Sequence, residues 1–211
     1  MQYKPAGQLL NVFRPEEIQS VAAALTKLKD APCILDASNT GGQLHAYTNG
    51  FCTTDLIYPF IKKKVLDRLE TVFDRPISLV HGMLLKAKNP WKIHTDYVKG
   101  DANPDIGILI PLNELPIDTH TVIFNESCTD TFGQTYMSNN TKLINNAVDL
   151  HDTLMSHETI ERLEYVSLLD AFKWHPGSVI YWDRKLLHAS DNFLKNNVTE
   201  KNALVLFTHT V

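Results

Sequence analysis

The chain has 211 residues, of which 44% are hydrophobic and 21% charged. This balance is typical of a globular domain and excludes disordered, collagen-like and coiled-coil chains. The formal net charge is −4, which gives no overall attraction to the phosphate backbone of a nucleic acid. No apolar stretch reaches the length of a membrane span. The length suits one domain that buries its own core.

Cysteine usage indicates the compartment. The three cysteines, Cys33, Cys52 and Cys128, are an odd number and form no CxxC pair. This argues against a disulfide framework and against a Cys-rich zinc site. The first ten residues lack the basic and apolar regions of a secretory signal. We therefore expect a soluble, cytoplasmic protein in a reducing environment, without membrane contact.

The N-terminal third predicts two helices. Apolar residues recur at helical spacing over 15–29, where Pro15 and two glutamates suit the first turn. A second apolar stripe runs over 55–73, and Thr54 or Asp55 could cap its start.

From residue 77 the hydrophobic period changes from helical to alternating. Residues 77–88 predict a long strand buried on one side. Shorter apolar runs predict further strands at 106–112, 121–124, 165–169, 178–182 and 203–208. Because strands do not alternate regularly with helices, a doubly wound sheet is disfavoured. The order favours a mainly β fold, a jelly roll or other double-sheet arrangement with flanking helices on one outer face.

These elements indicate a single domain over 1–211. Its N-terminal helices occupy about 15–73 and its jelly-roll core about 77–208. The polar segment of about 126–163 interrupts the core as an insertion, with a short helix near 147–163. An insertion of this length could form a lid or a wall of a substrate site.

The sequence His94-Thr95-Asp96 is the strongest candidate for chemistry. On a strand, residues i and i+2 point to the same face, so this imidazole and carboxylate could hold one metal ion. A second histidine from elsewhere would complete the 2-His-1-carboxylate set that binds non-haem Fe(II). The motif alone decides little, since random order would yield roughly 0.6 HxD matches in such a chain. A hydrogen-bonded surface pair is the ordinary alternative.

The downstream sequence strengthens the metal hypothesis. A Pro176-Gly177-Ser178 turn leads into an apolar strand, and His188 follows soon after that strand. Lys201 then opens the last apolar run. This order resembles that of the Fe(II)/2-oxoglutarate-dependent dioxygenases, including their prolyl-hydroxylase-like and phytanoyl-CoA-hydroxylase-like groups. The resemblance covers about residues 77–208 and implies a double-stranded β-helix, the cupin-like jelly-roll barrel of that superfamily.

The resemblance also implies roles for individual residues. His94, Asp96 and His188 would ligate Fe(II) as the catalytic centre, and Lys201 would pair with the distal carboxylate of 2-oxoglutarate. Dioxygen would take the remaining metal position. Members of the superfamily couple the decarboxylation of 2-oxoglutarate to succinate with oxidation of a C–H bond, and the metal carries the difficult step. We therefore expect a hydroxylase.

Two features depart from the family pattern. The separation of His94 and His188 is long, which the insertion explains. Many members have Arg-x-Ser where this chain has Lys201-Asn202-Ala203, and a lysine lacks the bidentate fork of arginine. Lys195 and Lys86 are therefore alternative anchors for the 2-oxoglutarate carboxylate.

Other side chains near the motifs have simpler interpretations. Trp182 flanks the ligands and is expected to pack, with a platform for the substrate as the alternative. Asp191 is expected in a turn, with an outer-shell hydrogen bond as the alternative. His151 and His157, in the insertion, do not have the spacing of a compact zinc pair.

The sequence leaves a second class of function open. A cupin-like or jelly-roll binding protein, with or without a metal, would perform no oxidation. Demethylation of nucleic-acid bases is disfavoured by the acidic charge and by the lack of a basic stretch with stacking aromatics. The prime substrate could be a small molecule or a protein side chain, and the sequence does not indicate an oligomeric state.

Overall fold

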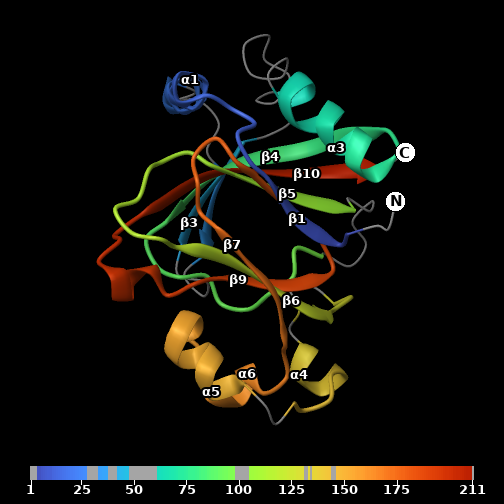
Figure 1. Cartoon of the computed structure of the whole chain (residues 1–211), viewed down its shortest axis with the longest axis vertical. Helices are drawn as coiled ribbons and strands as arrows, with labels where there is room; N and C mark the ends of the chain where they lie inside the picture. The colour runs from blue at the N-terminus through green and yellow to red at the C-terminus, as the bar shows by residue number, and fades with distance from the viewer. Residues whose placement is uncertain are drawn as a thin grey trace.

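The computed structural model describes residues 4–27, 33–37, 42–47, 61–97, 105–130, 133, 135–143 and 146–210. Two antiparallel sheets, of seven and three strands, face each other in this part of the chain (Figure 1). None of the helices described there has the length and apolar character needed to cross a membrane.

The larger sheet has the strand order β1-β8-β5-β10-β4-β3-β2. In that order its strands are Ala6–Leu9, Val179–Asp183, Ile106–Pro111, Lys201–Thr210, Ile77–Ala87, Gly42–Tyr47 and Cys33–Ala37. The smaller sheet has the order β7-β6-β9. Its strands are Leu168–Lys173, His120–Ser127 and Leu186–Ser190.

An isolated antiparallel bridge joins His94 to His188 of β9. The segment 91–97 therefore extends the smaller sheet beyond β9. From β4 onward the chain passes between the sheets: β4 lies in the larger sheet, segment 91–97 in the smaller, β5 in the larger and β6 and β7 in the smaller. It continues with β8 in the larger sheet, β9 in the smaller and β10 in the larger. This is the expected jelly-roll topology of a double-stranded β-helix.

Alternation along β10 shows which face of the larger sheet is inside. Ala203, Val205 and Phe207 pack in the core between the sheets, whose members include Ile123 and Leu186 from the smaller sheet. The intervening β10 residues Leu204 and Leu206 belong instead to a cluster on the outer face. This period of two is that of a strand buried on both sides.

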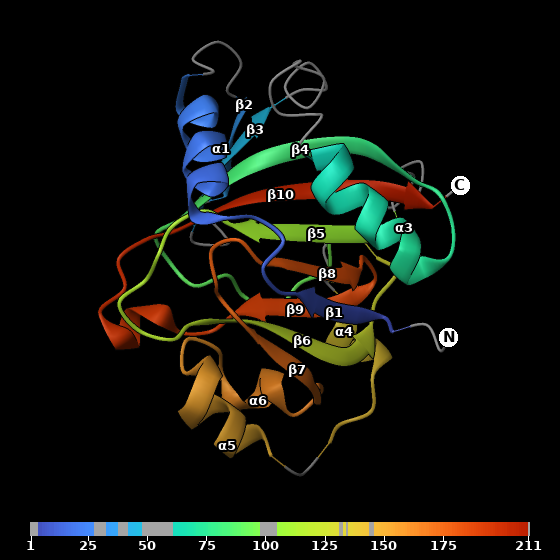
Figure 2. The same ribbon diagram turned by 45° about the horizontal axis from the view of Figure 1, so that its top comes forward.

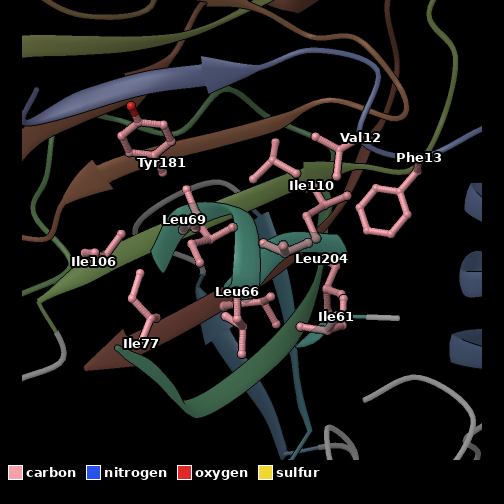
Figure 3. Close-up of a cluster of buried hydrophobic side chains, with 14 of the residues drawn as sticks. Val12, Phe13, Ile61, Leu66, Leu69, Ile77, Ile106, Ile110, Tyr181 and Leu204 are labelled. Atoms are coloured by element: carbon pink, nitrogen blue, oxygen red, sulfur yellow. The ribbon is translucent and has the colours of Figure 1, made fainter. Parts of the chain in front are cut away.

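The helices cover both outer faces. Helix α1 (Pro15–Lys27) and the continuous helix formed by the π-helical turn η1 (Lys62–Leu66) and α3 (Asp67–Phe73) lie against the larger sheet (Figure 2). Leu66 and Leu69 of this helix meet Ile110 and Leu204 of the sheet (Figure 3).

The insertion covers the other outer face. Its helices are α4 (Tyr136–Asn139), α5 (Ala147–Leu150), the π-helical turn η3 (His151–Met155) and α6 (Ile160–Leu163). Leu150, Met155 and Leu163 pack there with Val122 of β6 and Leu187 of β9. Figure 2 shows α5 and α6 below the smaller sheet. The insertion is therefore packed against the barrel wall.

The sequence located most elements within a few residues. The predicted helix from 15 and the strands from 77, 106 and 178 occur within two residues of their expected starts. The start of the helix expected over 55–73 lies outside the described residues, which resume at 61. The strand expected over 165–169 begins only at Leu168. Strands β1, β2, β3 and β9 were not predicted.

Candidate metal centre

The structure brings together the three side chains that the sequence suggested as ligands. One potential ligand atom from each of His94, Asp96 and His188 lies within 4.8 Å of the others. His188 Nε2 is 3.3 Å from Asp96 Oδ2, and His94 Nε2 is 3.9 Å from Asp96 Oδ1. The two imidazole centroids are 4.3 Å apart. Among the described residues, this is the cluster that could hold a metal ion.

Both imidazoles are held in the tautomer that a metal requires. His94 Nδ1 lies 2.7 Å from the carbonyl oxygen of Lys92, and His188 Nδ1 lies 3.1 Å from that of Leu186. A carbonyl only accepts hydrogen bonds, so each Nδ1 carries the proton and donates it. Each Nε2 then keeps a free lone pair directed toward Asp96. Backbone acceptors of this kind orient the histidine ligands of metal sites.

The Asp96 carboxylate is oriented from β8. The indole Nε1–H of Trp182 donates to Asp96 Oδ2 at 3.1 Å. The Trp182 ring also lies 4.8 Å, centroid to centroid, from His188. Gly107, opposite Trp182 in the register of β5 and β8, makes room for this ring, because a Cβ there would stand 2.8 Å from the indole. The sequence had favoured packing for Trp182 over a role as a platform for the substrate.

Arg184 is a site residue that sequence reasoning missed. It is 4% exposed, and its guanidinium donates to the carbonyl oxygen of Asp96 while stacking on Phe207 at 4.6 Å. A usable signal was present, because Arg184 lies two residues after Trp182, just beyond the buried strand. Charged residues so placed are seldom buried without a partner.

The electrostatics of His94 and Asp96 favour the binding of a cation at neutral pH. Burial, with a smaller effect from the neighbouring His188 imidazole, lowers the pKa of His94 to about 4. Burial alone would raise the pKa of Asp96, but the nearby imidazoles of His188 and His94 and the guanidinium of Arg184 outweigh it and lower the pKa to about 2. A neutral imidazole and an ionised carboxylate are the forms that bind metals.

Lys201 projects into the space between the sheets. Its side chain is 1% exposed, and its Nζ donates to the carbonyl oxygen of His120 at 2.9 Å. The rings of Trp174 and Phe193 lie 4.4 and 5.4 Å from Nζ. Burial lowers the pKa of Lys201 to about 8, although Asp191 acts in the opposite direction.

Asp191 is the counter-ion of this buried lysine. Its Oδ1 lies 3.4 Å from Lys201 Nζ, and its Oδ2 accepts the backbone N–H of His120 at 2.6 Å. The His120 ring Nδ1 is 3.3 Å from the same Oδ2. Asp191 begins the chain after β9, as expected for a turn, but it is buried and ties β6 to β10.

The two alternative anchors differ from Lys201. Lys195 lies in the 3-10 helix η4 (Phe193–Asn196), is exposed, and donates to the carbonyl of Asp152 at 2.8 Å. The backbone of Lys86 pairs with Asn202 in the register of β4 and β10, and its side chain lies outside the described part. Of the candidate anchors Lys195 and Lys201, whose side chains the structure describes, Lys201 is therefore the one between the sheets.

The two insertion histidines are not members of the cluster. His151 Nδ1 pairs with Asp152 at 2.9 Å. His157 Nε2 lies 3.2 Å from the carbonyl oxygen of Trp91.

Comparison with known proteins gives likeness in fold only. No protein-family model matches the chain, and no curated protein sequence matches it. Solved structures do match. SnoN, a non-haem α-ketoglutarate-dependent epimerase from nogalamycin biosynthesis, superposes with a TM-score of 0.62 at 11% identity, over 98% of this chain and 78% of that one. A Pseudomonas putida prolyl-4-hydroxylase gives 0.56 at 9% identity, over 98% and 93%.

The carbocyclase SnoK, also non-haem and α-ketoglutarate-dependent, gives a TM-score of 0.63 at 12% identity, over 97% of this chain and 79% of that one. The chain has the fold of the iron- and 2-oxoglutarate-dependent oxygenases. The three relatives are an epimerase, a hydroxylase and a carbocyclase, so this fold does not by itself select one reaction.

Proposed function

We propose that the chain is an Fe(II)- and 2-oxoglutarate-dependent oxygenase, and that it hydroxylates its substrate. The observation that carries the proposal is the convergence of His94, Asp96 and His188 with both Nε2 atoms free. The ligands come from segments that are adjacent only because 91–97 and β9 pair in the smaller sheet. The fold shared with known oxygenases supports the same proposal, but fold alone does not establish a function, so the ligand geometry is the main argument.

The donor set fits a ferrous ion. Two neutral imidazoles and one carboxylate form the facial triad of non-haem iron oxygenases, which leaves positions for a bidentate keto acid and dioxygen. When bound, iron would supply the activation of dioxygen. In the proposed reaction one oxygen atom of O2 enters the substrate C–H bond, and the other enters succinate as 2-oxoglutarate loses CO2. Atoms and electrons balance without an external reductant.

The protein's own groups would orient the co-substrate and keep the site dry. The Lys201 ammonium has three N–H donors, of which the His120 carbonyl and Asp191 engage two. The third would donate a charge-assisted hydrogen bond to the distal carboxylate of 2-oxoglutarate. Trp182 and Arg184 would hold Asp96 in place by its carboxylate and its carbonyl.

The prime substrate is a small molecule or a protein side chain in this proposal. The solved SnoN complex contains Fe3+, α-ketoglutarate and nogalamycin RO, which supports the small-molecule class. Nucleic acid is disfavoured by the net charge of −4. The competing function is a non-oxidising, cupin-like binding protein built on the same cluster.

Uncoupled turnover separates the two functions. Protein loaded with Fe(II) is incubated with 2-oxoglutarate and O2, and succinate is measured without a prime substrate. We expect slow succinate formation by the wild type, none by His94→Ala or Asp96→Ala, and wild-type rates for His175→Ala, which alters an exposed histidine outside the cluster. An iron-loaded wild type that forms no succinate would favour the binding protein.

A further inference from the structure

The segment that carries His94 and Asp96 lies at the edge of the smaller sheet. On one side its backbone pairs with β9, since His94 N donates to His188 O at 3.0 Å and His188 N donates to His94 O at 2.8 Å. In an antiparallel ladder the neighbouring residue turns its N–H and C=O the other way. The backbone groups of Ile93 therefore face away from β9, where no strand of the described chain continues the sheet.

Side chains from the insertion take the place of that missing strand. Glu158 Oε1 accepts the N–H of Ile93 at 2.7 Å. Arg162 donates from one terminal nitrogen to the Ile93 carbonyl at 3.5 Å and from the other to Glu158 Oε2 at 2.9 Å. Both polar groups of the residue before His94 are thus bonded to one ion pair.

This ion pair is itself held firmly. The Glu158 side chain is 2% exposed, so its carboxylate is shielded from competing water. Arg162 Nε donates to the hydroxyl of Tyr136 at 3.2 Å, and the guanidinium lies 5.7 Å from the centre of that ring. His157, next in the chain to Glu158, is hydrogen-bonded to the Trp91 carbonyl. The insertion therefore holds the metal-binding segment at two points.

We propose that the Glu158–Arg162 pair is a positioning device for the metal centre: it fixes the edge segment so that His94 and Asp96 stay aligned with His188. The insertion thereby holds the segment 91–97 in place from outside the barrel, and the metal affinity depends on this contact. Neither residue touches the metal. The inference rests on the proposed function only in requiring that the three ligands bind a divalent metal.

A purely structural role makes a different prediction. If the pair only anchored the insertion, its loss would lower the melting temperature but would leave the metal affinity of the folded protein unchanged well below that temperature. If it positions the ligands, affinity falls even where the variant is fully folded. Outer-shell partners of metal ligands typically contribute 10–100-fold in affinity.

The test is a titration of the metal-free full chain with Co(II), without 2-oxoglutarate, alongside thermal unfolding. Glu158→Ala is expected to weaken Co(II) binding about tenfold at a temperature where the protein is folded. Glu158→Gln keeps an acceptor for the Ile93 N–H and is expected to lose less. The matched control is Glu164→Gln, which removes a partly exposed pair with Lys142 just after α6 and is expected to bind Co(II) like the wild type.

Glu158→Ala with wild-type Co(II) affinity would overturn the proposal, and so would equal losses in Glu158→Ala and the control. If Glu158→Ala fails to fold, Glu158→Gln and Arg162→Lys provide the answer, because wild-type affinity in both would also overturn it. A wild type that binds no Co(II) would overturn the metal centre itself, which is a distinguishable result.

Discussion

His94 and His188 lie opposite each other in a two-residue antiparallel bridge, each amide donating to the other's carbonyl. Their ring centroids are consequently 4.3 Å apart. The relative position of the two imidazoles is thus set by backbone pairing, which is more rigid than a meeting of loop side chains. Such preorganisation is what a site needs to bind metal without rearranging.

Replacing His188 with alanine should abolish the stabilisation of the folded protein by a bound metal ion. A metal that binds only the folded state at 100 times its dissociation constant stabilises the protein by about 2.7 kcal/mol. We expect the wild type to gain a stabilisation of this order from Co(II), and His188→Ala to gain none while remaining folded without metal. Thermal unfolding with and without Co(II) measures this. A full metal-induced shift in His188→Ala would remove His188 from the ligand set.

The indole N–H of Trp182 should contribute to metal affinity without being a ligand. Trp182→Phe keeps an aromatic ring beside His188 but removes the donor to Asp96 Oδ2. We expect Co(II) binding to weaken about tenfold, the lower end of the effect of outer-shell partners. Trp174→Phe is the matched control, because the Trp174 indole donates to the carbonyl of Asn113. Equal affinities in the two variants would contradict the assignment.

The site was predictable where its signal is local. His94 and Asp96 are two residues apart, so alternation alone puts them on one face. His188 could be suggested only from its place after the Pro-Gly turn, because β9, with the sequence LLHAS, has no alternation of apolar and polar residues. The contact of Glu158 with Ile93 joins residues 65 apart in the chain, and no local pattern encodes it.

The fold was predictable for a similar reason. The long strand β4 and the buried strands β5 and β8 have strong apolar patterns. The four-residue strand β1 has none, and it forms only by pairing with β8. The burial of Asp191 illustrates the same limit, since Asp191-Asn192 reads locally as turn chemistry. Only the approach of Lys201 from β10 gives this carboxylate its partner.

The turn before β8 should be sensitive to any side chain. Gly177 has φ +85° and its carbonyl accepts the N–H groups of Val12 and Phe13. A Cβ there would stand 2.4 Å from the Phe13 carbonyl oxygen. We expect Gly177→Ala to lower the free energy of unfolding by about 1–3 kcal/mol, measured by urea denaturation. Unchanged stability would mean that the turn relaxes easily.

The binding of 2-oxoglutarate should weaken as the pH rises through the pKa of Lys201. That pKa is lowered to about 8 by burial, so the ammonium is charged at pH 6–7 and neutral above about pH 9. Because a carboxylate is attracted only to the charged form, affinity should be flat at low pH and fall about tenfold per unit above pH 8. The charged or titratable groups at Nζ are Asp191 and, through it, His120.

Variants of Asp191 and Lys201 are the controls for this pH dependence. Asp191→Asn removes the charge that raises the Lys201 pKa, so the fall in affinity should begin at lower pH. Lys201→Met should bind 2-oxoglutarate weakly at every pH while still binding Co(II), because the metal ligands are unchanged. Calorimetric titration of the Co(II)-loaded protein from pH 6 to about 9.5 follows both. A wild type with pH-independent affinity, or a Lys201→Met variant with normal affinity, would mean that another residue anchors the carboxylate.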